Sequence, residues 1–245
     1  MNKTNPLVII PTYNESMNID NLLHQIFSLT TVFDVLFIDD NSPDGTAAII
    51  KESQKDNPNI HLIEREGKLG LGTAYIKGFN WALENGYEYI CEMDADLSHN
   101  PKDLQKLYEA VANDGADLAI GSRYLTGVNV VNWPLGRVIM SYFASMYVRV
   151  ITGMKVMDTT AGFKCYRRIV LETINFDKIR SKGYGFQIEM KFHSWKYGFN
   201  VVEVPIVFTN RVKGVSKMSG GIFHEALWGV IKLKWRSFFT PYKKI

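Results

Sequence analysis

The sequence has no stretch of about 18 or more apolar residues free of charged side chains, so we expect no transmembrane helix. Its first residues reach Asn14 and Glu15 too early for a secretory signal peptide. Cysteine is scarce: the 245 residues contain only two, Cys91 and Cys165. Two cysteines are too few for a disulfide scaffold or a zinc site, which favours a reduced, cytosolic compartment.

Acidic side chains are nearly missing from the C-terminal end. From Arg211 onward the chain has eight basic residues and one acidic residue, Glu225, against twenty basic and twenty-four acidic residues before it. Aromatic side chains are interspersed there, at Trp228, Trp235, Phe238, Phe239 and Tyr242. Nucleic acid would match the charge alone, but tryptophan and tyrosine favour the headgroup level of a bilayer. We therefore expect no nucleic-acid partner, and an amphipathic helical extension over residues 216–245 that lies on a membrane surface.

The sequence does contain three apolar runs that each end in polar, acidic residues. These runs are residues 7–10, followed by 11–15; residues 35–38, followed by 39–46; and residues 87–93, followed by 94–96. The runs predict strands, and the helical patterns between them predict a doubly wound α/β fold with a mostly parallel sheet. All three polar segments then lie at the carboxyl edge of the sheet, where such folds bind ligands. No linker or repeat interrupts residues 1–215, which we expect to form one domain.

The third polar segment is a D-x-D motif, Asp94-Ala95-Asp96. Two carboxylates at i and i+2 on an extended chain point the same way. Ligands that are all oxygen suit Mg²⁺ or Mn²⁺, which share their coordination with water and substrate phosphates. The motif therefore indicates a clamp for a metal and a diphosphate. Taken alone it fits turn or capping residues as well, and its neighbours at the other strand ends favour the clamp.

Glycines recur in the turn Gly67–Gly72, in the order G-x-x-G-x-G, after a further predicted strand at residues 60–64, the third along the chain. A dinucleotide-binding fingerprint has the reverse spacing and follows the first strand. We therefore favour a tight turn that begins a helix, with the helix N-terminus close to a bound nucleotide.

Residues 135–153 predict a helix that is apolar around most of its circumference. One polar stripe recurs every four residues, at Arg137, Ser141, Ser145 and Arg149. Such a helix either packs in a core or dimer interface, or lies in a membrane interface. The basic aromatic tail favours the membrane.

Taken together, these motifs resemble a known family. The segments 11–15, 39–46 and 94–96 are similar to the signature of the inverting family-2 glycosyltransferases, which implies a GT-A-like nucleotide-sugar-binding fold. Four further segments, at 121–124, 158–164, 183–189 and 211–217, resemble those of dolichyl-phosphate mannose synthases. The resemblance runs from about residue 6 to 237. It implies a metal-dependent enzyme that transfers mannose from GDP-mannose to a polyprenyl monophosphate, peripherally, at the cytoplasmic face of a membrane.

The resemblance also implies roles for individual residues. Matching positions place Asp94, Asp96 and Ser98 at the metal, although some relatives carry glutamine in place of Ser98. Arg123 and Arg137 would face the acceptor phosphate. The full set of donor and metal contacts would be Pro11, Tyr13, Glu15, Ile38, Asp40, Asp94, Ala95, Asp96, Ser98, Arg123, Arg211 and Lys217.

Residue chemistry suggests how several of these groups act. Tyr13 can stack on the base, and the carboxylates of Glu15 and Asp40 can accept hydrogen bonds from ribose or base. Arg211 and Lys217 lie in a glycine- and serine-containing loop that we expect to act as a flap over the diphosphate. Asp158 stands where enzymes with hydroxyl acceptors carry a base, and we expect it instead to orient an arginine or lysine, with a structural cap as the alternative.

Two other functions remain open on sequence grounds. One keeps the chemistry but uses UDP-glucose or a UDP-N-acetylhexosamine as donor. The other is a nucleotide-sugar-binding protein without transfer activity. The QxxRW signature of processive polysaccharide synthases is absent from the sequence.

Overall fold

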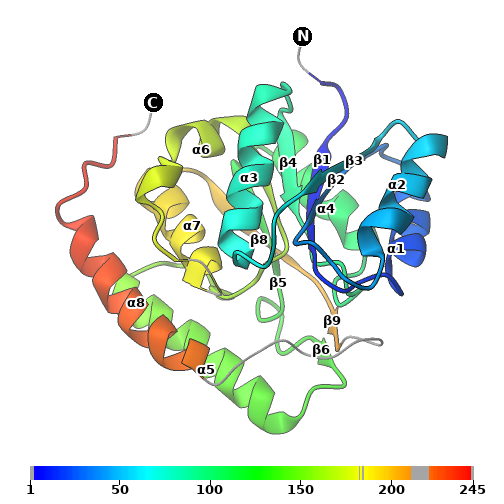
Figure 1. Ribbon diagram of the computed structural model, residues 1–245. Coiled ribbons are helices and arrows are strands. Elements are labelled where there is room, and N and C mark those ends of the chain that lie inside the picture. Colours follow the sequence, from blue (N-terminus) through cyan, green and yellow to red (C-terminus); the bar gives the residue numbers. More distant parts are fainter. Residues whose placement is uncertain (1–2, 182, 184, 211–220, 244–245) are drawn as a thin grey trace.

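A computed structural model describes residues 3–181, 183, 185–210 and 221–243 (Figure 1). Its centre is a seven-stranded sheet in the order β3-β2-β1-β4-β7-β5-β8. The strands are β1 (Leu7–Thr12), β2 (Asp34–Asp39), β3 (Ile60–Glu64), β4 (Tyr89–Glu92), β5 (Leu118–Ser122), β7 (Lys164–Arg167) and β8 (Val201–Pro205). The pairings are parallel except where β7 runs antiparallel between β4 and β5. The predicted α/β fold with a mostly parallel sheet is confirmed.

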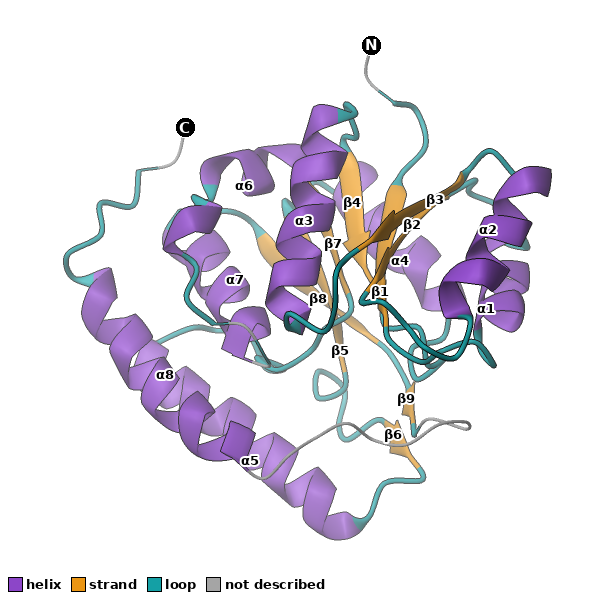
Figure 2. Ribbon diagram, in the orientation of Figure 1, coloured by secondary structure: helices purple, strands orange, loops and turns teal. Residues whose placement is uncertain are grey.

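Helices cover both faces of this sheet (Figure 2). One face packs against α1 (Ile19–Phe27), α2 (Thr46–Asp56) and α4 (Lys102–Ala112), and the other against α3 (Leu71–Glu84), α6 (Arg168–Thr173) and α7 (Gly185–Lys196). A short 3-10 helix, Phe176–Lys178, connects α6 to α7. Because a parallel strand with helices on both faces buries every side chain, runs such as Leu7–Ile10 are apolar throughout.

The chain from residue 201 to 208 does not form one continuous strand. β8 ends at Pro205, and β9 (Phe208–Thr209) pairs instead with β6 (Val130–Val131) in a separate two-stranded sheet. Proline has no N–H to donate to a ladder, which accounts for the end of β8 at this residue. The break directs β9 toward the loop that follows β4, where Thr209 N donates to the carbonyl of Ser98 at 3.1 Å.

The long helices α5 (Leu135–Thr152) and α8 (Gly221–Ser237) lie side by side at the edge of the domain (Figure 1). Tyr147 Oη donates to the carbonyl of Leu227 at 3.0 Å, and Lys234 Nζ donates to the carbonyl of Thr152 at 3.0 Å. Among the described residues, no helix is both long enough and apolar enough to cross a bilayer.

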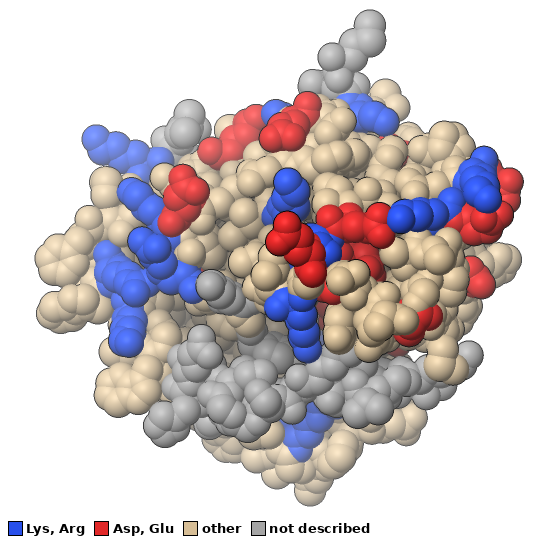
Figure 3. Space-filling view, viewed as in Figure 1, with Lys and Arg blue, Asp and Glu red and all other residues tan. Residues whose placement is uncertain are grey.

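The surface of α5 is largely apolar, and the polar stripe predicted for this helix does not form its solvent side. Ser145 is 1% exposed and faces the domain, whereas Phe143 is 55% exposed and Val150 76% exposed. On α8 and the residues after it, Trp228, Trp235, Phe238 and Phe239 are exposed as well. Figure 3 shows basic side chains gathered on the side of the molecule where α8 lies. The pair α5–α8 therefore presents apolar and basic groups together.

Candidate active site

The predicted site lies where the order of the sheet changes direction. β1 has β2 on one side and β4 on the other, and folds of this class bind ligands at the carboxyl edge beside such a change in strand order. Tyr13 and Glu15 follow β1, Asp40 follows β2, and the D-x-D motif follows β4. The tertiary structure thus brings the three predicted polar segments to one edge.

Hydrogen bonds join the loops after β1 and β2. Thr12 Oγ1 donates to Asp39 Oδ1 at 2.8 Å, and the amide of Asn14 donates to Ser42 Oγ at 3.0 Å. The amide of Glu15 donates to Thr46 Oγ1 at 3.0 Å. The two bonds donated by amides satisfy backbone groups that would otherwise lack partners, and all three bonds hold the loops against each other.

The glycine turn contacts the same loops. Arg65, just before it, donates through Nε to Asp40 Oδ1 at 2.6 Å and through Nη1 to Thr73 Oγ1 at 2.8 Å. Lys68 Nζ lies 5.2 Å from the centroid of the Tyr13 ring. Gly70 has a φ of 102°, a value that favours glycine, at the start of α3. The tight turn is therefore attached to the predicted donor side, and Arg65 and Lys68 are site residues that the sequence reasoning missed.

The D-x-D motif lies in a turn after β4, so the expectation of an extended chain there is wrong. Leu97 has a φ of 59°, a left-handed conformation that is strained for a residue with a side chain. This reversal brings the amide of Ser98 to Asp96 Oδ1 at 3.0 Å. Asp96 is buried, whereas the Asp94 side chain is 39% exposed.

The oxygen atoms of this turn fit a divalent cation. Ser98 Oγ is buried without a hydrogen-bond partner in the described structure, which is unusual for a hydroxyl and is consistent with a ligand position. The described residues contain no cluster of three or more His, Cys, Asp and Glu side chains that could hold a metal. Asp94, Asp96 and Ser98 would supply only part of the coordination of Mg²⁺ or Mn²⁺, with water and substrate phosphates supplying the rest, as Mg²⁺ commonly binds.

His99 follows this turn, and the sequence reasoning did not identify it. Its ring stacks on Phe163 with centroids 4.7 Å apart, and its Nδ1 accepts the amide N–H of Asp94 at 3.4 Å. Burial lowers the pKa of His99 to about 4, so the ring is neutral at pH 7. Only its place directly after the motif could have drawn attention to it.

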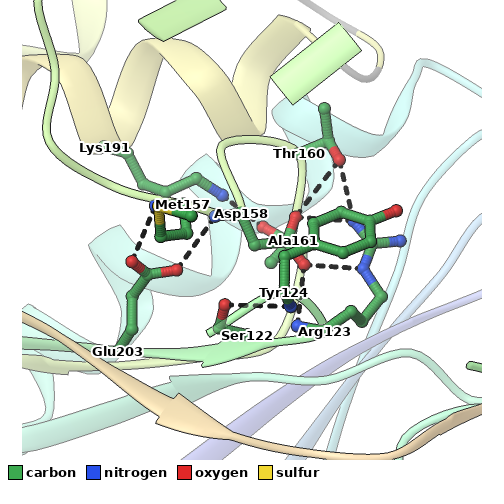
Figure 4. Close-up of polar contacts among 9 residues, drawn as sticks. All are labelled: Ser122, Arg123, Tyr124, Met157, Asp158, Thr160, Ala161, Lys191 and Glu203. Carbon is green, nitrogen blue, oxygen red and sulfur yellow. Dashed lines mark hydrogen bonds and ion pairs between the residues drawn. The ribbon is translucent and has the colours of Figure 1, made fainter. Parts of the chain in front are cut away.

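Arg123 and Asp158 form a buried ion pair at the end of β5 (Figure 4). Arg123 donates through Nε to Asp158 Oδ2 and through Nη2 to Asp158 Oδ1, both at 2.6 Å. Burial by itself would raise the pKa of Asp158, but Arg123 outweighs it and holds that pKa below its ordinary value. Asp158 thus contacts an arginine, and its orienting role stays a prediction. A carboxylate held in this way is a poor proton acceptor.

Other residues fix the loop that carries Asp158. Glu203 of β8 accepts the amide N–H groups of Met157 at 2.7 Å and Asp158 at 2.9 Å. Lys191 of α7 donates to the carbonyl of Ala161 at 2.5 Å (Figure 4). Burial lowers the pKa of Lys191 well below its ordinary value, and this lysine was not predicted from the sequence.

The guanidinium groups of Arg137 and Arg123 both lie against the ring of Trp133. The Cζ of Arg137 lies 4.0 Å from the ring centroid of Trp133, and that of Arg123 lies 5.5 Å from it. Arg137 Nη1 also donates to Asn210 Oδ1 at 3.2 Å. Two guanidinium groups therefore lie against one ring, where their N–H donors suit a phosphate, while the Asp158 carboxylate balances the charge of Arg123.

The other predicted donor contacts occupy different places. Pro11 and Ile38 are register partners on β1 and β2, and the Ile38 side chain is buried in the core, as is Ala95. A donor contact at Ile38 would therefore involve its backbone. Arg211 and Lys217 lie outside the described residues.

The comparisons with known proteins agree with this geometry. The model of glycosyl transferase family 2 matches residues 7–174. This chain belongs to that family. Its members are glycosyltransferases, and the resemblance drawn from the sequence motifs is confirmed.

Two curated members of family 2 are similar to this chain over most of its length. A polyprenol monophosphomannose synthase from Mycolicibacterium smegmatis is 47% identical over 230 residues, which cover 91% of this chain and 86% of that protein. An undecaprenyl-phosphate mannosyltransferase from Micrococcus luteus is 46% identical over 226 residues, which cover 92% of each chain.

Solved structures share the fold at low sequence identity. Glucosyl-3-phosphoglycerate synthase from Mycobacterium tuberculosis, in complex with phosphoglyceric acid, has a TM-score of 0.70 at 16% identity, with 94% of this chain and 80% of that chain covered. A mannosyltransferase from Pyrobaculum calidifontis, in complex with GDP-Man and Mn²⁺, has a TM-score of 0.58 at 16% identity, with 94% and 69% covered. These similarities confirm the GT-A-like fold of this family 2 member.

Proposed function

We propose that this chain transfers mannose from GDP-mannose to a polyprenyl monophosphate, with inversion at the anomeric carbon. The observation that carries the proposal is the arginine pair at Trp133, beside the D-x-D turn. The distances of 4.0 and 5.5 Å from the Trp133 ring place both guanidinium groups in one small region. A phosphate acceptor needs such charge, whereas a hydroxyl acceptor needs a base. The two mannosyltransferase relatives carry polyprenol or undecaprenyl phosphate in their names, which supports the same acceptor.

The donor would bind along the carboxyl edge. Tyr13 would stack on or border the base, and Glu15 and Asp40 would accept hydrogen bonds from the nucleoside. Asp94, Asp96 and Ser98 would hold Mg²⁺ or Mn²⁺, which when bound would stabilise the charge that develops on the leaving diphosphate. Arg211 and Lys217 remain proposed contacts to that diphosphate.

The reaction then needs no general base. The second pKa of a phosphate monoester is near 6, so the acceptor is largely dianionic at neutral pH. Arg123 and Arg137 would hold one phosphate oxygen in line with the anomeric carbon, which forms a bond to that oxygen as its bond to the diphosphate breaks. Asp158 keeps Arg123 in place through its two hydrogen bonds of 2.6 Å and takes no proton.

The face formed by α5 and α8 would bring this site to the bilayer. We propose that the chain, with residues 216–245 as its membrane-binding extension, binds peripherally on the cytoplasmic face. The acceptor phosphate sits at headgroup depth, so an enzyme must present its arginines at that level. Exposed Phe143, Trp235 and Phe239 would enter the interface, and nearby basic residues would add roughly 1 kcal/mol each on an anionic surface.

Calorimetric titration tests the donor. GDP-mannose with Mn²⁺ should bind more tightly than UDP-glucose or UDP-N-acetylglucosamine. Addition of a short polyprenyl phosphate should then yield the mannosyl phospholipid. Tighter binding of a UDP-sugar would show that this UDP-sugar, and not GDP-mannose, is the donor. Binding of GDP-mannose without product for any polyprenyl phosphate would favour a non-catalytic binding protein.

Flotation with vesicles tests the membrane face. Binding to anionic vesicles should be strong at low salt and weaker at high salt, because only the electrostatic part is screened. A protein that does not float with anionic vesicles at low salt would refute the membrane proposal and favour a dimer interface on the exposed face of α5.

A further inference from the structure

Four aromatic rings form a continuous stack across the site, which we call the ring stack: Trp133, Phe208, His99 and Phe163. The centroids of Trp133 and Phe208 are 5.3 Å apart, those of Phe208 and His99 are 5.2 Å apart, and those of His99 and Phe163 are 4.7 Å apart. The first two contacts are edge-to-face and the third is stacked, which are favoured geometries for aromatic pairs.

The members of the ring stack come from different parts of the chain. Trp133 precedes α5, Phe208 belongs to β9, His99 follows the D-x-D turn, and Phe163 precedes β7. His99 and Phe208 also form an isolated backbone bridge. The ring stack therefore connects Trp133 and Phe208, which lie outside the main sheet, to the ends of β4 and β7 within it.

His99, the third ring of the stack, contacts the proposed metal turn. His99 Nδ1 accepts the amide N–H of Asp94, and the same nitrogen lies 3.9 Å from Asp94 Oδ2. The other end contacts the proposed acceptor side, because both Arg123 and Arg137 lie against Trp133. Phe208, in the middle, lies 5.6 Å from Arg123 as well.

The indole of Trp133 acts through its ring rather than through its N–H. Trp133 Nε1 is buried and has no acceptor among the described residues. A buried donor without a partner costs about 1–3 kcal/mol, which the contacts of the ring must offset. A phenyl ring at this position would keep most of those contacts, and an aliphatic side chain would not.

We propose that the ring stack sets the distance between the acceptor arginines and the D-x-D turn, with Trp133 as the positioning residue. The inference rests on the proposed function, in which the acceptor oxygen and the anomeric carbon must approach to about 3–3.5 Å. A displacement of about 1 Å costs roughly 100-fold in rate. Without the ring both arginines keep their charge and Asp158 still holds Arg123. Arg137, whose Cζ lies 4.0 Å from the ring centroid, loses the contact that fixes its position relative to the donor.

Steady-state kinetics of Trp133→Leu and Trp133→Phe test this, with a short polyprenyl phosphate as acceptor and GDP-mannose as donor. Trp133→Leu should lower kcat about 10- to 100-fold, while the calorimetric Kd of GDP-mannose with Mn²⁺ stays within about twofold. Trp133→Phe should restore kcat to within about fivefold of wild type. Trp81→Leu is the matched control, because Trp81 packs on Tyr87 and His61, away from the site.

Three results would overturn the inference. The first is a Trp133→Leu variant with wild-type kcat, and the second is equal impairment of the Leu and Phe variants, which would assign the role to the N–H. The third is a parallel loss of donor affinity, which would make Trp133 a general structural residue. An inactive wild type would instead refute the proposed function, and this inference with it, so the two failures are distinguishable.

Discussion

The donor side and the acceptor side of the site are held by different kinds of contact. On the donor side, short hydrogen bonds join neighbouring loops, such as those from Thr12 to Asp39 and from Glu15 to Thr46. On the acceptor side, Arg123 is held by the buried carboxylate of Asp158 and by aromatic rings, and Arg137 lies on the ring of Trp133. Each side contains a buried ion pair, Arg65–Asp40 on the donor side and Arg123–Asp158 on the acceptor side. The donor side adds hydrogen bonds between loops, whereas the acceptor side adds contacts with aromatic rings.

This difference predicts how each side responds to substitution. Loop hydrogen bonds are individually worth about 1 kcal/mol, so the loss of one changes donor affinity modestly. A buried ion pair is different, because removal of one partner leaves the other charge buried and uncompensated. We expect changes on the donor side to affect KM for the donor and changes on the acceptor side to affect kcat, with a loss of stability wherever a buried ion pair is broken.

Asp96→Ala should have the largest effect, because it removes a proposed metal ligand between the two sides. We expect transfer to fall below a tenth of the wild-type rate at saturating Mg²⁺ or Mn²⁺. Retention of more than a tenth would mean a loss of less than ~1.4 kcal/mol and would contradict the assignment. Asp114→Ala, an exposed site at the end of α4, serves as the control.

Asp158→Asn should come next, because it leaves the Arg123 guanidinium without its carboxylate. We expect a loss of about 3 kcal/mol in the free energy of unfolding at pH 7, and a fall in kcat with little change in donor affinity. Urea denaturation of both proteins measures the first effect, and steady-state kinetics the second. Normal kcat in the variant would show that Arg123 needs no orienting partner.

The same pair gives a pH dependence of known sign. The folded-state pKa of Asp158 is lowered, so its contribution to stability is complete above the unfolded value of about 4 and is lost as pH falls through the folded value. The stability difference between wild type and Asp158→Asn should therefore narrow below about pH 4. A constant difference from pH 7 to pH 3 would contradict the lowered pKa.

Arg65→Ala tests the donor side and should have a smaller effect. Without Arg65, Asp40 loses its ion pair and the glycine turn loses its attachment to that carboxylate. We expect the Kd of GDP-mannose to rise about tenfold, equivalent to ~1.4 kcal/mol, with kcat at saturating donor close to wild type. Arg167→Ala is the control, because Arg167 is half exposed at the far end of β7. If Arg65→Ala lowered kcat without changing the Kd of GDP-mannose, the proposed difference between the donor side and the acceptor side would be wrong.

Trp235→Ser combined with Phe239→Ser should leave the chemistry unchanged. Both side chains are exposed and belong to no part of the proposed site. The rate of transfer to a short, soluble acceptor should therefore match that of the wild type. Binding to anionic vesicles should weaken about tenfold or more, because apolar burial in the interface is lost. Val32→Ser, an exposed apolar site on the opposite part of the domain, provides the comparison. Unchanged vesicle binding would locate the membrane contact elsewhere.

Much of the donor side could be read from the sequence. The residues that end strands and begin helices belong to a few polar types with short side chains, and they follow apolar runs directly. This is why the segments at Asn14, Asp40 and Asp94 were recognisable. The turn at Leu97 was not, because a leucine gives no local signal for a left-handed conformation.

The acceptor side was predicted less completely. Arg123, Arg137 and Asp158 were named through the family resemblance, but Trp133, His99 and Lys191 were not. Ring contacts and buried charges depend on which segments meet in space, and neither periodicity nor spacing encodes that. The antiparallel β7 was also missed, because four residues give no signal of strand direction.

The sequence by itself determined the α/β class, the polar strand ends and the basic, aromatic C-terminal region, because these follow from local composition and period. Only the tertiary structure decided that Trp133 lies against two arginines and that Asp158 pairs with Arg123. It also decided that α5 exposes Phe143 and Val150 while burying Ser145. The physical reason is that burial and pairing depend on contacts between segments far apart in the chain, whereas hydrophobic period and turn chemistry are properties of a few neighbouring residues.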